Sequence, residues 1–155
     1  MPVSASHVNR RAPIPPNDQA LLAELRTLLA KQADVLVAYL FGSRARGTAG
    51  PISDIDIAVL LEPGADSWNR SLELLGDLST LNDSAQVDLV ILNDASIDLG
   101  YRVLRDGIVL TCKDEKSRIA HFVRTVNEYL DMAPFRRTLA AGLTHRLEEG
   151  RFGRP

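Results

Sequence analysis

Three short apolar runs, rich in β-branched and aromatic residues, constrain the fold of this chain more than any other feature. They are VLVAYLF at 35–41, DIDIAVLL at 54–61 and VDLVIL at 87–92. Runs of this length that are apolar at nearly every position are typical of strands buried on both faces, whereas helices need about ten or more residues. We therefore expect three central strands, and a short run at 108–110 predicts a small fourth one.

The segments between and after these runs are helical in pattern, because apolar residues recur at intervals of three and four. Helices are expected over 18–32, after Asp66, over 96–105, over 119–130 and over 135–147. The apolar stripes are Trp68, Leu72, Leu75 and Leu78 in the second helix, Ile119, Phe122, Val123, Val126 and Leu130 in the fourth, and Phe135, Leu139, Leu143 and Leu147 in the fifth. Gly107 is expected to end the third helix, and 42–53 to be a turn-rich connection. This order predicts an α/β domain, with helices packed on a mixed sheet of three or four strands.

A chain of 155 residues suggests one domain with extensions. Four prolines without periodicity indicate a flexible arm over 1–16, followed by a core domain over 17–111 and a helical extension over 112–155. From residue 113 onward there are nine basic and six acidic residues, so the net charge of −2 divides into +3 for this tail and −5 for the rest. Bulk electrostatics therefore give no reason to expect stable nucleic-acid binding.

The composition also bears on location. No apolar run approaches the ~18 residues of a membrane helix, and the first residues lack the apolar centre of a signal peptide. The single cysteine, Cys112, excludes an intramolecular disulfide framework and a multi-cysteine zinc site. The three histidines show no metal-binding spacing and are expected to be structural or exposed. We expect a cytoplasmic protein with no membrane partner.

Two carboxylates on one face of an otherwise apolar strand are the strongest chemical signal. Asp54 and Asp56 point the same way, about 7 Å apart. Asp88, near the start of the next apolar strand, would complete a three-carboxylate cluster if the two strands are neighbours, although Asp83 also lies nearby. Oxygen clusters of this kind suit Mg²⁺ or Mn²⁺, and two such ions clamp an in-line attack on phosphorus.

A glycine and a serine directly after the first strand supply the complementary half of such a site. Gly42 allows a phosphate to approach the backbone, and the Ser43 hydroxyl can donate to it. Arg44 and Arg46 can neutralise a triphosphate, although Arg44 is equally compatible with a surface position. The two halves together predict nucleotidyl transfer.

At this point the sequence resembles a known family. Gly-Ser, ten residues, Asp-x-Asp and a distal strand Asp resemble the signature of the DNA polymerase β-like nucleotidyltransferase superfamily, and GSRARG with SDIDIAVL resembles its minimal nucleotidyltransferases. The resemblance covers roughly residues 18–111 and rests on Gly42, Ser43, Arg46, Gly47, Ser53, Asp54, Asp56 and Asp88. It implies that Gly42, Ser43, Arg46 and Ser53 bind the nucleotide. It also implies that Asp54, Asp56 and Asp88 bind two Mg²⁺ ions, with Asp88 as the base toward the acceptor hydroxyl.

The resemblance also implies a biological role. Many minimal nucleotidyltransferases are antitoxins that transfer AMP from ATP to a tyrosine of a partner HEPN ribonuclease toxin, and the helical tail of this chain could dock such a partner. Two alternatives stay open: an antitoxin that only masks a toxin by binding, and a small-molecule transferase of the antibiotic type. Three metal-binding carboxylates are unnecessary for a mask, and 155 residues leave little room for a small-molecule domain.

Overall fold

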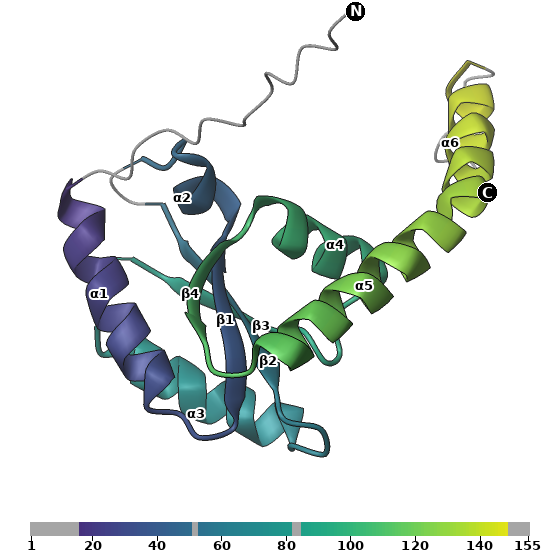
Figure 1. Ribbon diagram of the computed structural model, residues 1–155. Helices are drawn as coiled ribbons and strands as arrows, with labels where there is room; N and C mark the ends of the chain where they lie inside the picture. Colours follow the sequence, from purple (N-terminus) through teal and green to yellow (C-terminus); the bar gives the residue numbers. More distant parts are fainter. Residues whose placement is uncertain (1–15, 51–52, 82–84, 149–155) are drawn as a thin grey trace, which may run out of the picture.

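The computed structural model describes residues 16–50, 53–81 and 85–148 (Figure 1). The arm expected at 1–16 lies outside these ranges except for its last residue, Pro16, with which the first helix begins. Asp83, the alternative to Asp88, also lies outside the described residues.

The expected strands and helices are all present, and one helix is added. The elements are α1 (Pro16–Ala30), β1 (Val35–Phe41), α2 (Gly42–Arg46), β2 (Ile55–Leu61), α3 (Ser67–Ser79), β3 (Val87–Ile91), α4 (Ile97–Asp106), β4 (Ile108–Cys112), α5 (Glu115–Asp131) and α6 (Ala133–Glu148). The addition is α2, which lies inside the connection expected to be turn-rich. The four strands with covering helices confirm the predicted α/β fold class.

Helix ends follow local side-chain chemistry. Asp66, Ser96 and Asp114 each accept a hydrogen bond from a backbone N–H in the first turn of the helix that follows. Gly47 ends α2 in the left-handed conformation, with φ of 74°. Gly107 ends α4 as expected but in an extended conformation, where glycine is needed because a Cβ would lie 2.4 Å from the carbonyl oxygen of Val103.

The four strands form one mixed sheet in the order β3-β2-β1-β4. β1 is antiparallel to both β2 and β4, whereas β2 and β3 run parallel. The parallel pair places Asp56 directly beside Asp88 in the register. The condition under which Asp88 could join the other two carboxylates is therefore met.

Helices cover both faces of the sheet (Figure 1). On one face, leucines of α1 and α3 pack with Val35, Ile57 and Val59 in the main core cluster. On the other face, Val103 of α4 packs with Tyr39 and Leu60 in a smaller cluster. The site residues lie at one end of this double-sided core, where β1 ends and β2 begins.

Only part of the apolar stripe expected on α3 is buried. Leu74 and Leu78 are fully buried, but Trp68 and Leu72 are 72% and 53% exposed. The stripe was predicted from spacing alone, which identifies the helix but not the point at which the sheet beneath it ends. The first half of α3 therefore carries apolar side chains that no described part of the chain covers.

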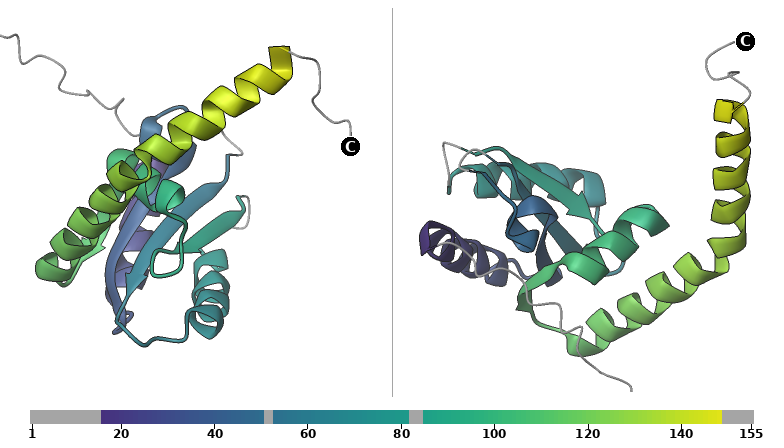
Figure 2. Two further views of the ribbon diagram at one scale, coloured as in Figure 1. Left: turned by 90° about the vertical axis from the view of Figure 1, so that its right-hand side faces the viewer. Right: turned by 90° about the horizontal axis from the view of Figure 1, so that it is seen from above.

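The last two helices expose their apolar stripes as well. α5 buries His121 and Thr125, while Ile119, Phe122 and Val123 remain 43–49% exposed. No residue of α6 is buried, and α6 extends away from the body of the protein (Figure 2). None of the described helices is both long and apolar enough to cross a membrane. These two stripes thus remain without a partner within the described chain.

Candidate active site

The centre of the candidate site is a close contact between Gly42 and Asp56. Phe41, the last residue of β1, pairs with Asp56 of β2, so that Gly42 lies just beyond this pair. Gly42 has φ of 72°, and a Cβ built on it would lie only 2.1 Å from Oδ2 of Asp56. Glycine is therefore required here for two reasons, the positive φ and the space that the carboxylate occupies.

Three carboxylates border this contact from neighbouring backbone positions. Asp54 precedes Asp56 by two residues, and Asp88 stands beside Asp56 across the parallel β2–β3 pair. Asp54 and Asp88 are exposed, whereas Asp56 is half-buried. Burial, together with the charges of Asp88 and Asp54, raises the pKa of the Asp56 carboxyl above its usual value, and Arg46 acts in the opposite direction. The site thus concentrates negative charge that a cation would stabilise.

The donor set suits a hard divalent cation, because three carboxylates offer oxygen ligands alone. Among the described residues, however, no group of three or more acidic, histidine or cysteine side chains is already arranged around a metal position. The backbone brings the three aspartates together, and two of their side chains are exposed and therefore able to reorient.

Ser43 and Arg46 lie on α2, which begins at the Gly42–Asp56 contact. Ser43 is half-buried and its carbonyl oxygen accepts from the backbone N–H of Thr48 at 3.0 Å, which folds the following loop back on the helix. Arg46 is exposed, and its charge is close enough to Asp56 to lower the pKa of that carboxyl. Ser43 and Arg46 thus follow the Gly42–Asp56 contact within four residues, on the helix that continues from β1.

Arg44 is not a surface residue, and its guanidinium is engaged by other groups of the protein. It is 8% exposed, and its Nη1 donates to Oδ1 of Asp18 in α1 at 2.7 Å. Its Nε and Nη2 both donate to the carbonyl oxygen of Ser53, at 3.2 and 2.8 Å. Arg44 therefore holds the segment that leads into Asp54 and Asp56 against α2. No local pattern of residues indicates this role, because the partners of Arg44 are 26 and 9 residues away.

Ser53, expected to bind nucleotide, uses its side chain locally. Its Oγ accepts a hydrogen bond from the backbone N–H of Gly50 at 2.7 Å. Together with the bonds from Arg44 to its carbonyl oxygen, this contact makes Ser53 the fixed end of the loop that enters β2.

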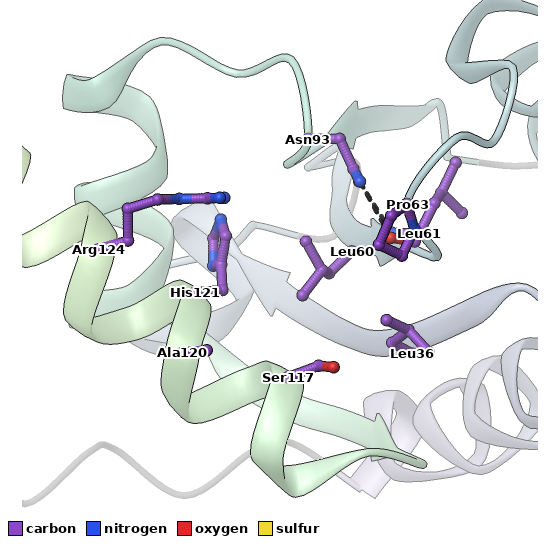
Figure 3. A pocket seen from close by; sticks show the side chains of 9 residues that line it. All are labelled: Leu36, Leu60, Leu61, Pro63, Asn93, Ser117, Ala120, His121 and Arg124. Atoms are coloured by element: carbon purple, nitrogen blue, oxygen red, sulfur yellow. Dashed lines mark hydrogen bonds between the residues drawn. The ribbon is translucent and has the colours of Figure 1, made fainter.

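A cavity of 470 Å³ lies at the opposite end of the sheet, where β2 ends and β1 begins (Figure 3). His121 and Arg124 of α5 line it together with Leu36 and Leu60. His121 is 94% buried, in keeping with its expected structural role, and its Nδ1 has no hydrogen-bond partner among the residues that the structure describes. Burial, followed by the charge of Arg124, lowers the pKa of this imidazole. This cavity is separate from the carboxylates, which lie near the start of β2.

The chain resembles two bacterial enzymes with a stated activity. It is 35% identical to the protein adenylyltransferase MntA of Shewanella oneidensis over 113 residues, which are 73% of this chain and 77% of that protein. It is also 35% identical to the protein adenylyltransferase MntA of Aphanizomenon flos-aquae over 104 residues, which are 57% and 67% of the two chains.

Solved structures agree in fold. A toxin–antitoxin crystal structure with AMP-PNP matches with a TM-score of 0.69 and 31% identity, over 79% of this chain and 98% of that one. The complex of the tri-AMPylated Shewanella oneidensis HEPN toxin with its MNT antitoxin matches with a TM-score of 0.65 and 28% identity, over 81% and 98%.

The family model "Polymerase beta, Nucleotidyltransferase" matches residues 23–116, more than half of the chain. The matched stretch contains the Gly42–Asp56 contact, all three carboxylates and the whole sheet. The chain therefore belongs to the polymerase β-like nucleotidyltransferases, and within them to the minimal nucleotidyltransferase family that includes the MntA proteins.

Proposed function

We propose that this protein is an antitoxin that transfers AMP from ATP to a tyrosine hydroxyl of a partner HEPN toxin. The single observation that carries this proposal is the Gly42–Asp56 contact, with Asp54 and Asp88 beside it. A strand that only stabilises the fold has no reason to hold a half-buried carboxylate with a raised pKa between two further carboxylates.

We assign Asp54, Asp56 and Asp88 as ligands for two Mg²⁺ ions, which when bound supply charge neutralisation and polarise the α-phosphate. Gly42, Ser43, Arg46 and Ser53 form the nucleotide side of the site. The Ser43 hydroxyl donates to a phosphate oxygen, and the Arg46 guanidinium offsets triphosphate charge. Ser53 acts by fixing the loop rather than through a free hydroxyl.

We assign Asp88 as the base on the resemblance to the family; it is exposed on β3, the strand next to Asp56. Its carboxylate accepts the proton of the acceptor hydroxyl while that oxygen bonds to the α-phosphorus of ATP. The bond from the α-phosphorus to the bridging oxygen breaks, and pyrophosphate leaves. The product is a phosphodiester between AMP and the acceptor, and its negative charge would repel RNA near a ribonuclease site.

The relatives support a protein acceptor: MntA is named a protein adenylyltransferase, and an MNT antitoxin is solved with a tri-AMPylated HEPN toxin. The exposed stripe of α6, Phe135, Leu139, Leu143 and Leu147, supports a protein partner for this chain. We therefore divide the chain into a transferase unit over 17–111 and a partner-docking extension over 112–155. Dependence on ATP assigns the activity to the cytoplasm.

Mass spectrometry of the HEPN protein co-expressed with this chain tests the proposal. The wild type should add one or more AMP groups, and Asp56→Asn should add none while still binding the partner. Asp77→Asn, an exposed aspartate on α3, is the matched control and should behave as the wild type. A partner that stays unmodified with the wild type would contradict the proposal. If Asp56→Asn still neutralised the HEPN toxin fully, the alternative of an antitoxin that acts by binding alone would be favoured.

A second pair of variants separates docking from chemistry. Leu139→Glu with Leu143→Glu places charges on the α6 stripe, and should weaken partner binding and reduce modification together. Ala141→Glu adds a charge on another exposed position of the same helix and is the control. Because α6 buries no residue, none of these variants should change the melting temperature.

A further inference from the structure

β3 is an edge strand whose outer side is unpaired in the described part of the chain. It pairs with β2 alone in the order β3-β2-β1-β4. Ile55 N donates to Gln86 O, and Leu92 N donates to Val59 O, both at 2.8 Å. Because the backbone groups of alternate residues in a strand point to the same side, Leu89 and Ile91 direct theirs away from β2. The carbonyl oxygen of Ile91 already accepts from the backbone N–H of Asp94 at 3.2 Å. The N–H and C=O of Leu89 and the N–H of Ile91 are therefore the groups that face a further strand along the described edge.

An apolar groove accompanies this free edge. A cavity of 390 Å³ lies between α3 and β3, lined among others by Trp68, Ser71, Leu89 and Ile91. Leu89 and Ile91 are only half-buried, and Trp68, with Leu72 one helical turn on, is among the most exposed apolar side chains of the described chain. A tryptophan in this position is typical of the anchors that dominate protein interfaces.

The edge leads directly to the candidate active site. Asp88 is the second residue of β3 and stands beside Asp56. A segment that paired with the outer side of β3 would therefore pass within one or two residues of the carboxylate that takes the acceptor proton. The left view of Figure 2 shows β3 at the margin of the sheet beside α3.

We propose that the acceptor protein binds through an extended segment that adds to the sheet along the free edge of β3, with an apolar side chain in the Trp68 groove. This inference rests on the proposed transfer to a protein hydroxyl. Main-chain hydrogen bonds to the N–H and C=O of Leu89 and to the N–H of Ile91 would supply affinity, and the groove would supply specificity.

The register restricts the acceptor sequence. Asp88 and Ile91 are three residues apart and point to opposite faces of the sheet, with Ile91 on the α3 face. The modified hydroxyl residue and its apolar anchor must therefore be separated by an odd number of positions. Three positions span about 10 Å of strand, which matches the separation along β3.

Steady-state transfer to the intact HEPN partner tests this proposal. Trp68→Ala should raise the KM for the partner at least tenfold and leave kcat and the KM for ATP within about twofold, because Trp68 is outside the carboxylate site. Val109→Ala is the matched control: Val109 is 39% exposed on β4, the opposite edge strand. It should leave all three constants unchanged.

Amide exchange followed by NMR adds a readout that does not depend on activity. A synthetic peptide spanning the modified residue of the partner should slow the exchange of the Leu89 and Ile91 amides in the wild type, and less so in Trp68→Ala. Equal KM values for Trp68→Ala and Val109→Ala, or no slowing at Leu89 and Ile91, would overturn edge binding while leaving the transferase function intact. No transfer by the wild type would instead overturn the proposed function itself.

Discussion

At the scale of single residues, Gly42 carries the most specific requirement of the site. We expect Gly42→Ala to reduce AMP transfer at least 100-fold, because the new Cβ would occupy the position of Oδ2 of Asp56 and displace that carboxylate. The same variant also places alanine at φ of 72°, which costs about 1–2 kcal/mol by itself. Transfer assays and urea unfolding on the same preparation measure both effects.

Gly64→Ala separates crowding from backbone strain. Gly64 has φ of 83°, but a Cβ there meets no atom within 4 Å. The Gly64→Ala variant should lose about as much unfolding free energy from backbone strain as Gly42→Ala does, and should keep full transfer activity. If the two variants lost activity equally, the close approach to Asp56 would not be the reason for Gly42.

The residues of the site divide by how local their signals are. Gly42, Ser43, Asp54 and Asp56 could be identified from spacing, because chemistry and strand alternation both act within a few positions of the chain. Arg44 could not, because its role depends on Asp18 in another helix and on a carbonyl oxygen across a loop.

At the scale of elements, Arg44 joins α1, α2 and the segment that enters β2. We expect Arg44→Met to lower the unfolding free energy by about 2–4 kcal/mol, because it leaves Asp18 unpaired and the carbonyl oxygen of Ser53 without its two donors. Asp18→Asn should cost less, since the bonds to Ser53 remain. Arg46→Met, on the same helix but exposed, should change stability by less than about 0.5 kcal/mol. Urea unfolding ranks the three, and a loss for Arg46→Met as large as for Arg44→Met would contradict this assignment.

Elements also show what apolar periodicity can and cannot predict. Spacing correctly indicated the helices at α3, α5 and α6, because a 3.6-residue period is a property of each segment alone. It could not indicate which stripe the chain covers, because this depends on where the sheet ends. Trp68 lines an open groove beside the edge strand β3, and Ile119 lies on the side of α5 away from His121. The exposed halves of these stripes are the surfaces to which we assign partners.

At the scale of the whole molecule, strand content was predictable and strand order was not. Each strand is a local apolar run, whereas the order β3-β2-β1-β4 depends on pairing between distant segments. The parallel neighbourhood of β2 and β3 matters most, because it makes Asp88 part of the site. The apolar stripe of α6 likewise predicts a helix, but nothing in the sequence predicts that this helix extends away from the body of the protein.

The free energy of unfolding of the protein should depend on pH through His121 of α5, which is buried against the sheet. Burial and Arg124 lower the pKa of this imidazole from its ordinary 6.5, so the unfolded chain takes up a proton at a higher pH than the folded protein does. The unfolding free energy should therefore fall as the pH drops below about 6.5 and be unaffected by this group above it. Urea unfolding between pH 7.5 and about 5 should show a weaker pH dependence for His121→Gln than for the wild type, because the variant lacks the group whose pKa is lowered on folding. Equal pH dependence in the two proteins would mean that His121 is protonated as readily in the folded state as in the unfolded one, and would contradict the effect assigned to its burial.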